Sequence, residues 1–164
     1  EHFPIPKAPQ VKIRVGDGRA VLDGTREGSF DVIVRDAFAS GVTPDHLRTV
    51  ECTDQVRRVL TASGVYLVNC AHGGPANARQ DVAALQDVFP FVASIQDPKV
   101  GRGGRRGNVV ALASATDVVN VDEIDRALRM LALPARITRP ADLARWVAGT
   151  PALTDSQVGY PPAD

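Results

Sequence analysis

The sequence has little of what marks membrane, disulfide-rich or nucleic-acid-binding proteins. It contains 2 cysteines, 1 tryptophan and 5% aromatic residues, and its 19 basic residues balance 19 acidic ones. No run approaches the roughly 18 apolar residues of a membrane helix, and residues 1–10 lack the basic start and apolar core of a secretion signal. We therefore expect a cytoplasmic protein with no membrane partner and no general attraction to nucleic acid.

The length and hydrophobic content of the chain are typical of one globular domain. The chain has 164 residues, of which 44% are hydrophobic, so it can bury a substantial core. Cys52 and Cys70 show neither metal-ligand spacing nor a paired framework, and we interpret both as free thiols. The prolines near the C-terminus favour a division into a domain over residues 1–150 and a frayed tail over residues 151–164.

Apolar runs bounded by glycine and polar residues predict five strands, at residues 11–15, 30–36, 64–71, 91–97 and 108–114. Helical patterns follow most of them, at residues 19–23, 43–60 with a break near Thr49, 73–89, 121–132 and 140–149. The run at 30–36 is typical of a central strand covered on both faces.

The order of these elements predicts an α/β fold. Strands that alternate with helices form a mostly parallel sheet with helices on both faces. The loop at residues 98–107 has no room for a helix, so we expect the last two strands to form an antiparallel hairpin.

Polar residues follow several of the predicted strands. Asp17, Asp36 and Asn69 lie at or just after strand ends, where parallel sheets bind their ligands. Asp17 could accept hydrogen bonds from a ligand or cap the next helix. Asp36 could act as a general base or anchor a cationic substrate, or it could cap a loop. His72 follows a strand end and is a candidate for lining a cleft.

The loop GRGGRRG, residues 101–107, concentrates arginines among glycines. It could bind phosphate or nucleic acid. However, it lacks the lysine and the serine or threonine that a phosphate-binding loop places ahead of a helix. A solvated hairpin connection is therefore the favoured interpretation.

The order of several motifs resembles the C-terminal two-thirds of spermidine-synthase-like proteins, which belong to the S-adenosylmethionine-dependent methyltransferase superfamily. The resemblance covers roughly residues 1 to 150 and is carried by EHFPIP, IRVGDGRAVL, FDVIVRDAF, HLRTVE, VRRVLTASGVYLVN and GNVVALAS. It implies a Rossmann-like methyltransferase fold. It also implies transfer of an aminopropyl or methyl group to an amine or another small nucleophile, from S-adenosylmethionine or decarboxylated S-adenosylmethionine.

The resemblance also assigns roles to residues. It implies that Asp17 contacts the adenine, with Gly16 and Gly18 shaping that pocket, and that Asp36 is the base for the attacking amine. We expect Asp36 and Ala37 also to contact the cofactor. Phe38, Asn69 and His72 are the candidates for binding the substrate.

Two departures from the family pattern change what we expect. Ala39 stands where polyamine aminopropyltransferases carry a second carboxylate, so a diamine would lose a charge-assisted contact of about 1.5–3 kcal/mol. The glycine-rich first loop and two strands are also missing. We therefore expect a fold that is incomplete on its N-terminal side, completed by an upstream segment or by a homodimer. We expect the chain alone to bind the nucleoside weakly or not at all.

Two other functions remain open. The chain could be a non-catalytic binding or assembly module that kept the scaffold and lost the cofactor loop. Alternatively, Arg102, Arg105 and Arg106 could bind nucleic acid, although only local charge favours this.

Overall fold

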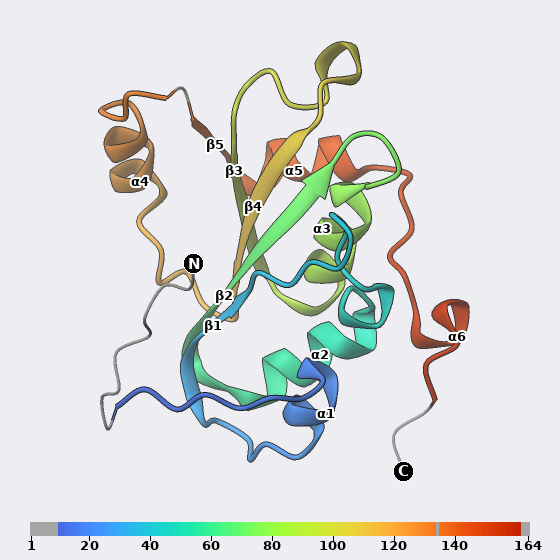
Figure 1. Ribbon diagram of the computed structural model, residues 1–164. Coiled ribbons are helices and arrows are strands. Elements are labelled where there is room, and N and C mark those ends of the chain that lie inside the picture. Colours follow the sequence, from blue (N-terminus) through green and yellow to red (C-terminus); the bar gives the residue numbers. More distant parts are fainter. Residues whose placement is uncertain (1–9, 134, 162–164) are drawn as a thin grey trace, which may run out of the picture.

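A five-stranded mixed sheet organises the chain, with strand order β1-β2-β4-β3-β5. The computed structural model describes residues 10–133 and 135–161, and Figure 1 shows how the elements are arranged. In chain order the elements are α1 (Gly18–Asp23), β1 (Phe30–Arg35), η1 (Asp45–Leu47), α2 (Val50–Val59), β2 (Leu60–His72), α3 (Ala78–Val88), β3 (Phe91–Gln96), η2 (Arg102–Gly104), β4 (Gly107–Ser114), α4 (Val121–Leu128), β5 (Arg136–Thr138), α5 (Pro140–Val147) and α6 (Asp155–Val158). The motif at residues 1–6 lies outside the described residues.

The pairing of the strands confirms the α/β class and the antiparallel hairpin. β1 and β2 are parallel, with Ile33 opposite Tyr66. β4 then pairs antiparallel with both β2 and β3, with Leu112 opposite Leu67 and Ala93. β1, β2 and β3 consequently run in one direction, and their carboxyl ends lie at the same edge of the sheet.

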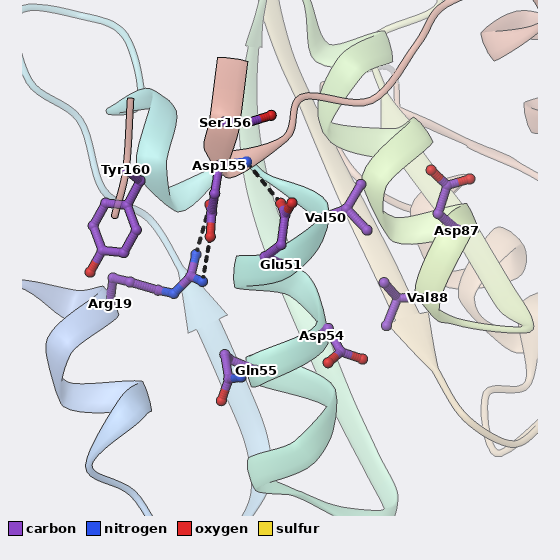
Figure 2. A pocket seen from close by; sticks show the side chains of 10 residues that line it. All are labelled: Arg19, Val50, Glu51, Asp54, Gln55, Asp87, Val88, Asp155, Ser156 and Tyr160. Carbon is purple, nitrogen blue, oxygen red and sulfur yellow. Dashed lines mark hydrogen bonds and ion pairs between the residues drawn. The ribbon is translucent and has the colours of Figure 1, made fainter. Parts of the chain in front are cut away.

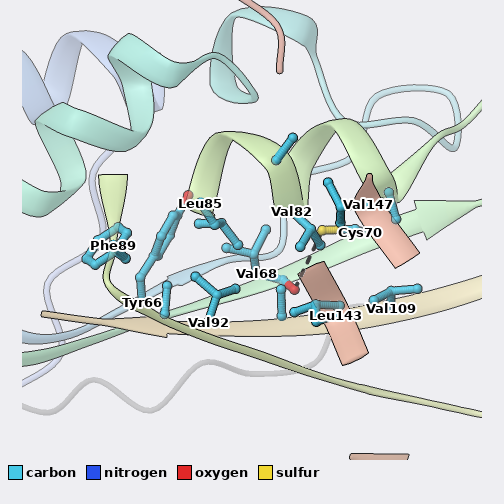
Figure 3. Close-up of a cluster of buried hydrophobic side chains, with 14 of the residues drawn as sticks. Tyr66, Val68, Cys70, Val82, Leu85, Phe89, Val92, Val109, Leu143 and Val147 are labelled. Atoms are coloured by element: carbon cyan, nitrogen blue, oxygen red, sulfur yellow. Dashed lines mark hydrogen bonds between the residues drawn. The ribbon is translucent and has the colours of Figure 1, made fainter. Parts of the chain in front are cut away.

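The core lies on one face of the sheet, where α2, α3 and α5 cover β2, β4 and β3 (Figures 1 and 3). Burial alternates along β2, because Tyr66, Val68 and Cys70 point into this core and are only 2%, 1% and 1% exposed. Val82 of α3 and Leu143 of α5 are also buried here. Burying each such side chain contributes about 1.5–3 kcal/mol to the free energy of folding.

The expected strand at residues 11–15 is wrong. These residues have no regular secondary structure, and Val15 is fully exposed. An extended segment becomes a strand only when its backbone N–H and C=O groups pair with a neighbour. No described strand pairs with this segment.

The expectation that β1 is a central strand covered on both faces is also wrong. β1 is an edge strand that pairs only with β2 among the described strands. Val32 and Val34 point away from the helix-covered face and are 56% and 62% exposed. Apolar side chains on one face of β1 are therefore left uncovered by the described residues.

The predicted break in the long helix near Thr49 is confirmed. η1 ends before it, and α2 begins after it, with the Thr49 hydroxyl accepting a hydrogen bond from the Cys52 amide at 3.1 Å. Such N-caps satisfy an amide that has no partner within the helix.

The expectation of a frayed tail is wrong for residues 151–161. The Leu153 carbonyl accepts a hydrogen bond from the Val50 amide at 2.9 Å, and Asp155, the first residue of α6, is only 9% exposed. Residues 162–164 lie outside the described part of the chain, and the domain boundary at residue 150 stays a prediction.

Across the described residues, helices are too short or too polar to cross a bilayer. Cys52 and Cys70 are free thiols, as expected from the sequence, and both are buried.

Candidate functional site

A cavity of about 280 Å³, which we call the β1-end cavity, lies where the chain leaves β1. Asp36 and Ala37 line it from the end of the strand, and Gly18 lines it from the start of α1. Three of the predicted site residues thus share one hollow at the carboxyl edge of the sheet. The remaining wall is mainly apolar side chains of β1, η1 and α2.

Asp36 is held by a short chain of amides that crosses the sheet. Its Oδ1 accepts a hydrogen bond from Asn69 Nδ2 at 3.0 Å, and Asn69 Oδ1 accepts one from Asn108 Nδ2 at 2.9 Å. This places Asp36 and Asn69 together, as strand ends in a parallel pair require. Asp36 Oδ2 makes no hydrogen bond to any residue that the structure describes, so this oxygen can accept one from a ligand.

Asp17 has a different setting. Its Oδ1 accepts hydrogen bonds from the Arg19 and Ala20 amides at 2.9 and 3.1 Å and so caps α1. Its Oδ2 lies 2.8 Å from His46 Nε2. The hydrogen bond to His46 lowers the pKa of Asp17. The carboxylate therefore works as a helix cap, and its contact with an adenine stays a prediction.

A buried ion-pair network, which we call the Asp81 network, supports the wall of the β1-end cavity. Arg35, which lines the cavity, forms an ion pair with Asp81 of α3 and donates a hydrogen bond to the Leu47 carbonyl at 2.8 Å. Arg48 binds the same carboxylate, with its Nη2 at 2.9 Å from Oδ2. The network joins β1, α3 and the η1–α2 junction, and it fixes the Arg35 guanidinium.

The other polar groups in the wall stay neutral. Burial raises the pKa of the Tyr66 hydroxyl and the Cys52 thiol, and it raises that of the neighbouring Cys70 thiol to about 12. All three therefore remain protonated near neutral pH and offer no nucleophilic thiolate. Asp36 is the one carboxylate among the described residues that line this cavity.

The structure does not bring the remaining candidates into the cavity. The His72 ring packs beside Trp146, with ring centroids 5.4 Å apart, and lines a separate cavity. Phe38 is 41% exposed and does not line the β1-end cavity, and Gly16 has open space around its Cα. Their roles in binding stay predictions.

A larger cavity, of about 890 Å³, lies against α2, α3 and the C-terminal segment (Figure 2). Its most buried polar groups already bind one another. Arg19 pairs with Asp155 at 2.9 Å, and the Asp155 amide donates to Glu51 at 2.9 Å. Tyr160 lies under the Arg19 guanidinium, 4.9 Å from Cζ to the ring centroid. We assign this cluster to the attachment of the tail, and size alone does not make it the reaction site.

Sequence reasoning missed the Asp81 network and the Arg19–Asp155 pair. Arg35 and Asp81 are 46 residues apart, and Arg19 and Asp155 are 136 apart. No local motif marks such contacts. The one available signal was charge within apolar stretches, as in Arg35 at the end of a buried-looking strand.

Comparison with known proteins confirms the resemblance to spermidine synthases. A probable spermidine synthase from Corynebacterium glutamicum has 35% sequence identity and a TM-score of 0.83, covering 92% of this chain and 56% of that one. The polyamine aminopropyltransferase of Vibrio vulnificus is 24% identical over 133 residues, which is 80% of this chain and 42% of that protein. No protein-family model matches the chain.

More distant structures show the fold. Spermidine synthase from Thermotoga maritima gives a TM-score of 0.53 at 16% identity, and human methyltransferase-like protein 13 in complex with SAH gives 0.56 at 15% identity. The mixed sheet is thus that of Rossmann-like methyltransferases. The chain spans about half the length of these relatives, at 51% and 64% of the two structures.

Proposed function

We propose that this chain forms the acceptor side of a transferase of the S-adenosylmethionine-dependent superfamily. Asp36 at the mouth of the β1-end cavity carries the proposal. It has a carboxylate oxygen available to a ligand and a fixed orientation through Asn69, and it is the one carboxylate among the described residues that line the cavity. The likeness to a probable spermidine synthase supports transfer of an aminopropyl or methyl group to a small nucleophile.

In this proposal Asp36 accepts a proton from the acceptor. S-adenosylmethionine or its decarboxylated relative would supply an electrophilic carbon bound to a sulfonium sulfur. The acceptor nitrogen forms a bond to that carbon as the carbon–sulfur bond breaks, and the nitrogen loses a proton. Positioning and proton transfer are what this chain contributes, and general base catalysis of this kind is worth about 10²–10⁴-fold in rate.

The cavity fits part of such a donor. Its volume of about 280 Å³ lies just below the range of about 300–1,000 Å³ typical of small-molecule sites. Gly18 and Ala37 offer a close approach to backbone, whereas the Asp17 carboxylate is already bound to α1 and His46. The chain therefore provides a wall of the donor site, and further polypeptide would complete it.

The edge of β1 is where we place that further polypeptide. β1 pairs on one side only among the described strands, and Val32 and Val34 leave an apolar surface beside the open edge. An unpaired strand edge with exposed apolar side chains is a site for strand addition. Either an upstream segment or a second copy of the chain would pair there.

The acceptor is proposed to carry no more than one positive charge near Asp36. Ala39 cannot supply a second carboxylate, and Arg35 adds a guanidinium to the same cavity wall. A diamine carries two positive charges, and this site offers only one carboxylate to pair with them. Amines with a single charge are the better acceptors to test.

The test is a transfer assay with labelled S-adenosylmethionine and decarboxylated S-adenosylmethionine against a panel of mono- and diamines, run on the chain joined to the segment that completes the β1 edge. Asp36→Asn keeps the hydrogen bond from Asn69 and removes the base, so we expect about 10²–10⁴-fold lower transfer. Asp31→Asn, in the same strand and hydrogen-bonded to Thr61, is the matched control and should leave the rate unchanged. Equal rates in both variants would remove Asp36 from the chemistry.

A second candidate function is a non-catalytic binding module, which is favoured by Ala39 and by the engagement of Asp17. Calorimetric titration with methylthioadenosine and decarboxylated S-adenosylmethionine separates the two. Heat that disappears in Asp17→Ala supports the transferase. Absence of binding even with an added segment that pairs with β1 supports the module.

A further inference from the structure

A second cavity opens at the same edge of the sheet and belongs to a different set of residues. This basic cavity, of about 450 Å³, is formed by the end of β2 with the start of α3, the loop after β3, and β5 with α5. Its characteristic side chains are Arg79, Arg102, Arg136, His72 and Trp146. None of the residues that line it also lines the β1-end cavity.

The charge of the basic cavity is uncompensated. Within residues 10–133 and 135–161, Arg79, Arg102 and Arg136 form no ion pair. The one carboxylate in the lining, Asp142, is paired with Arg145. Like charges that share a cavity repel each other unless an anion lies between them, so the arrangement favours a negatively charged ligand.

His72 adds a neutral donor to these charges. Its Nδ1 accepts a hydrogen bond from the Ala78 amide at 3.3 Å, which leaves the ring proton on Nε2. Burial, together with the charge of Arg79, lowers the pKa of His72 and keeps the ring neutral. His72 Nε2 lies close to the backbone of Gly101. A Cβ added at Gly101 would lie only 3.1 Å from this nitrogen.

One wall of the basic cavity is apolar. Trp146 and Pro98 contribute to it, and the Arg79 guanidinium lies over the indole with its Cζ 5.2 Å from the ring centroid. The volume is larger than inorganic phosphate needs and falls within the range of about 300–1,000 Å³ of small-molecule sites. The cavity therefore has room for an anionic group and an attached organic body.

We propose that the basic cavity binds a small organic phosphate. Guanidinium groups match phosphate oxygens in geometry as well as in charge, and they arrive here from three separate segments of the chain. The organic body of the ligand packs against Trp146 and Pro98. This site is additional to the proposed transfer reaction and does not depend on it.

The same arginines do not form a strip for a nucleic-acid backbone. Of the three loop arginines, only Arg102 lines the cavity, and Arg105 pairs with Asp97 at 3.3 Å. The Arg106 side chain packs on Gly74. A Cβ added at Gly74 would lie 2.8 Å from Arg106 Nε. The structure thus gathers cations around one hollow instead of along a groove.

The test uses phenyl phosphate and inorganic phosphate as probes. Binding is followed by the fluorescence of Trp146, because the chain has 1 tryptophan. We expect saturable binding of phenyl phosphate, tighter than that of inorganic phosphate because its ring packs on the apolar wall. Arg102→Gln and Arg136→Gln should each weaken it about tenfold, the effect of one lost charge-assisted hydrogen bond. Arg126→Gln, which removes an exposed charge of α4 outside the cavity, should change the affinity less than about twofold.

Three outcomes would overturn the proposal. The first is that neither probe shows saturable binding to the parent chain or to the variants, while circular dichroism shows that all of these proteins are folded. The second is equal weakening by Arg126→Gln, which would indicate general charge attraction only. The third is binding of a single-stranded oligonucleotide without binding of phenyl phosphate, which would assign these arginines to nucleic acid.

Discussion

Replacing Asp81 with alanine tests whether the Asp81 network holds the β1-end cavity together. Asp81 is 4% exposed and binds Arg35 and Arg48, whose side chains are 9% and 12% exposed. The substitution leaves two guanidinium groups facing each other in the protein interior. Arg48 keeps its ion pair with the exposed Asp45, at 2.8 Å, but the Arg35 guanidinium is left without a carboxylate partner and cannot reach bulk water without moving β1.

The expected loss of stability follows from that burial. Removing one partner of a buried ion pair costs about 3–5 kcal/mol, because the remaining charge is left uncompensated. For a domain of this size each kcal/mol lowers Tm by about 2–4 °C, so Asp81→Ala should lower it by roughly 6–20 °C. Since Arg35 lines the cavity, ligand binding at Asp36 should weaken as well.

Urea unfolding followed by circular dichroism measures the change, and Asp125→Ala is the matched control. Asp125 forms an ion pair with Arg129, whose side chain is 74% exposed, and its removal should cost at most about 1 kcal/mol. A loss below about 1 kcal/mol in Asp81→Ala would refute the claim that the network is buried and supports the site.

The remaining predictions concern the tail, a histidine and a helix cap. Asp155→Ala removes the ion pair with Arg19, so amide hydrogen exchange of residues 151–160 should accelerate at least tenfold. The NMR titration of His72 should give a pKa below 6.5 that rises toward 6.5 in Arg79→Gln. Because its folded pKa is depressed, the stability contributed by His72 is complete above about pH 6.5 and is lost as the pH falls through the folded pKa. Asp17→Ala should cost about 1 kcal/mol of unfolding free energy by uncapping α1.

Each of these has a clear contrary result. Unchanged exchange in the tail would mean that backbone contacts alone hold it. A His72 pKa that does not respond to Arg79→Gln would mean that the guanidinium lies away from the ring in solution. An Asp17→Ala variant as stable as the parent would remove the capping role and reopen adenine binding for this carboxylate.

The sequence predicted the four long strands of the sheet better than the N-terminal segment and the short edge strand β5. The strands at 30–36, 64–71, 91–97 and 108–114 were visible because their apolar runs have the length and the boundaries of strands. The segment at 11–15 has a similar pattern but no partner strand among the described residues, and strand formation depends on the partner. β5, with its 3 residues, is too short to leave a pattern.

The candidate site was predictable to the extent that it follows from strand order. Asp36 and Asn69 were expected to meet because they end neighbouring parallel strands, and they do. Of the arginines that line the two cavities, the sequence singled out only Arg102, through the loop at residues 101–107. Arg48 reaches Asp81 across 33 residues of sequence, and such pairing is set by how helices pack and not by spacing along the chain.

The bond between the first helix and the last has a consequence for biosynthesis. Arg19 is made well before its partner Asp155, which lies 136 positions later in the chain. Until Asp155 has been made, the Arg19 guanidinium and the adjoining surface of α2 face solvent or a chaperone, and α1 can detach repeatedly. Closure of this long loop is a late step, which makes the unfinished chain the form most exposed to proteolysis.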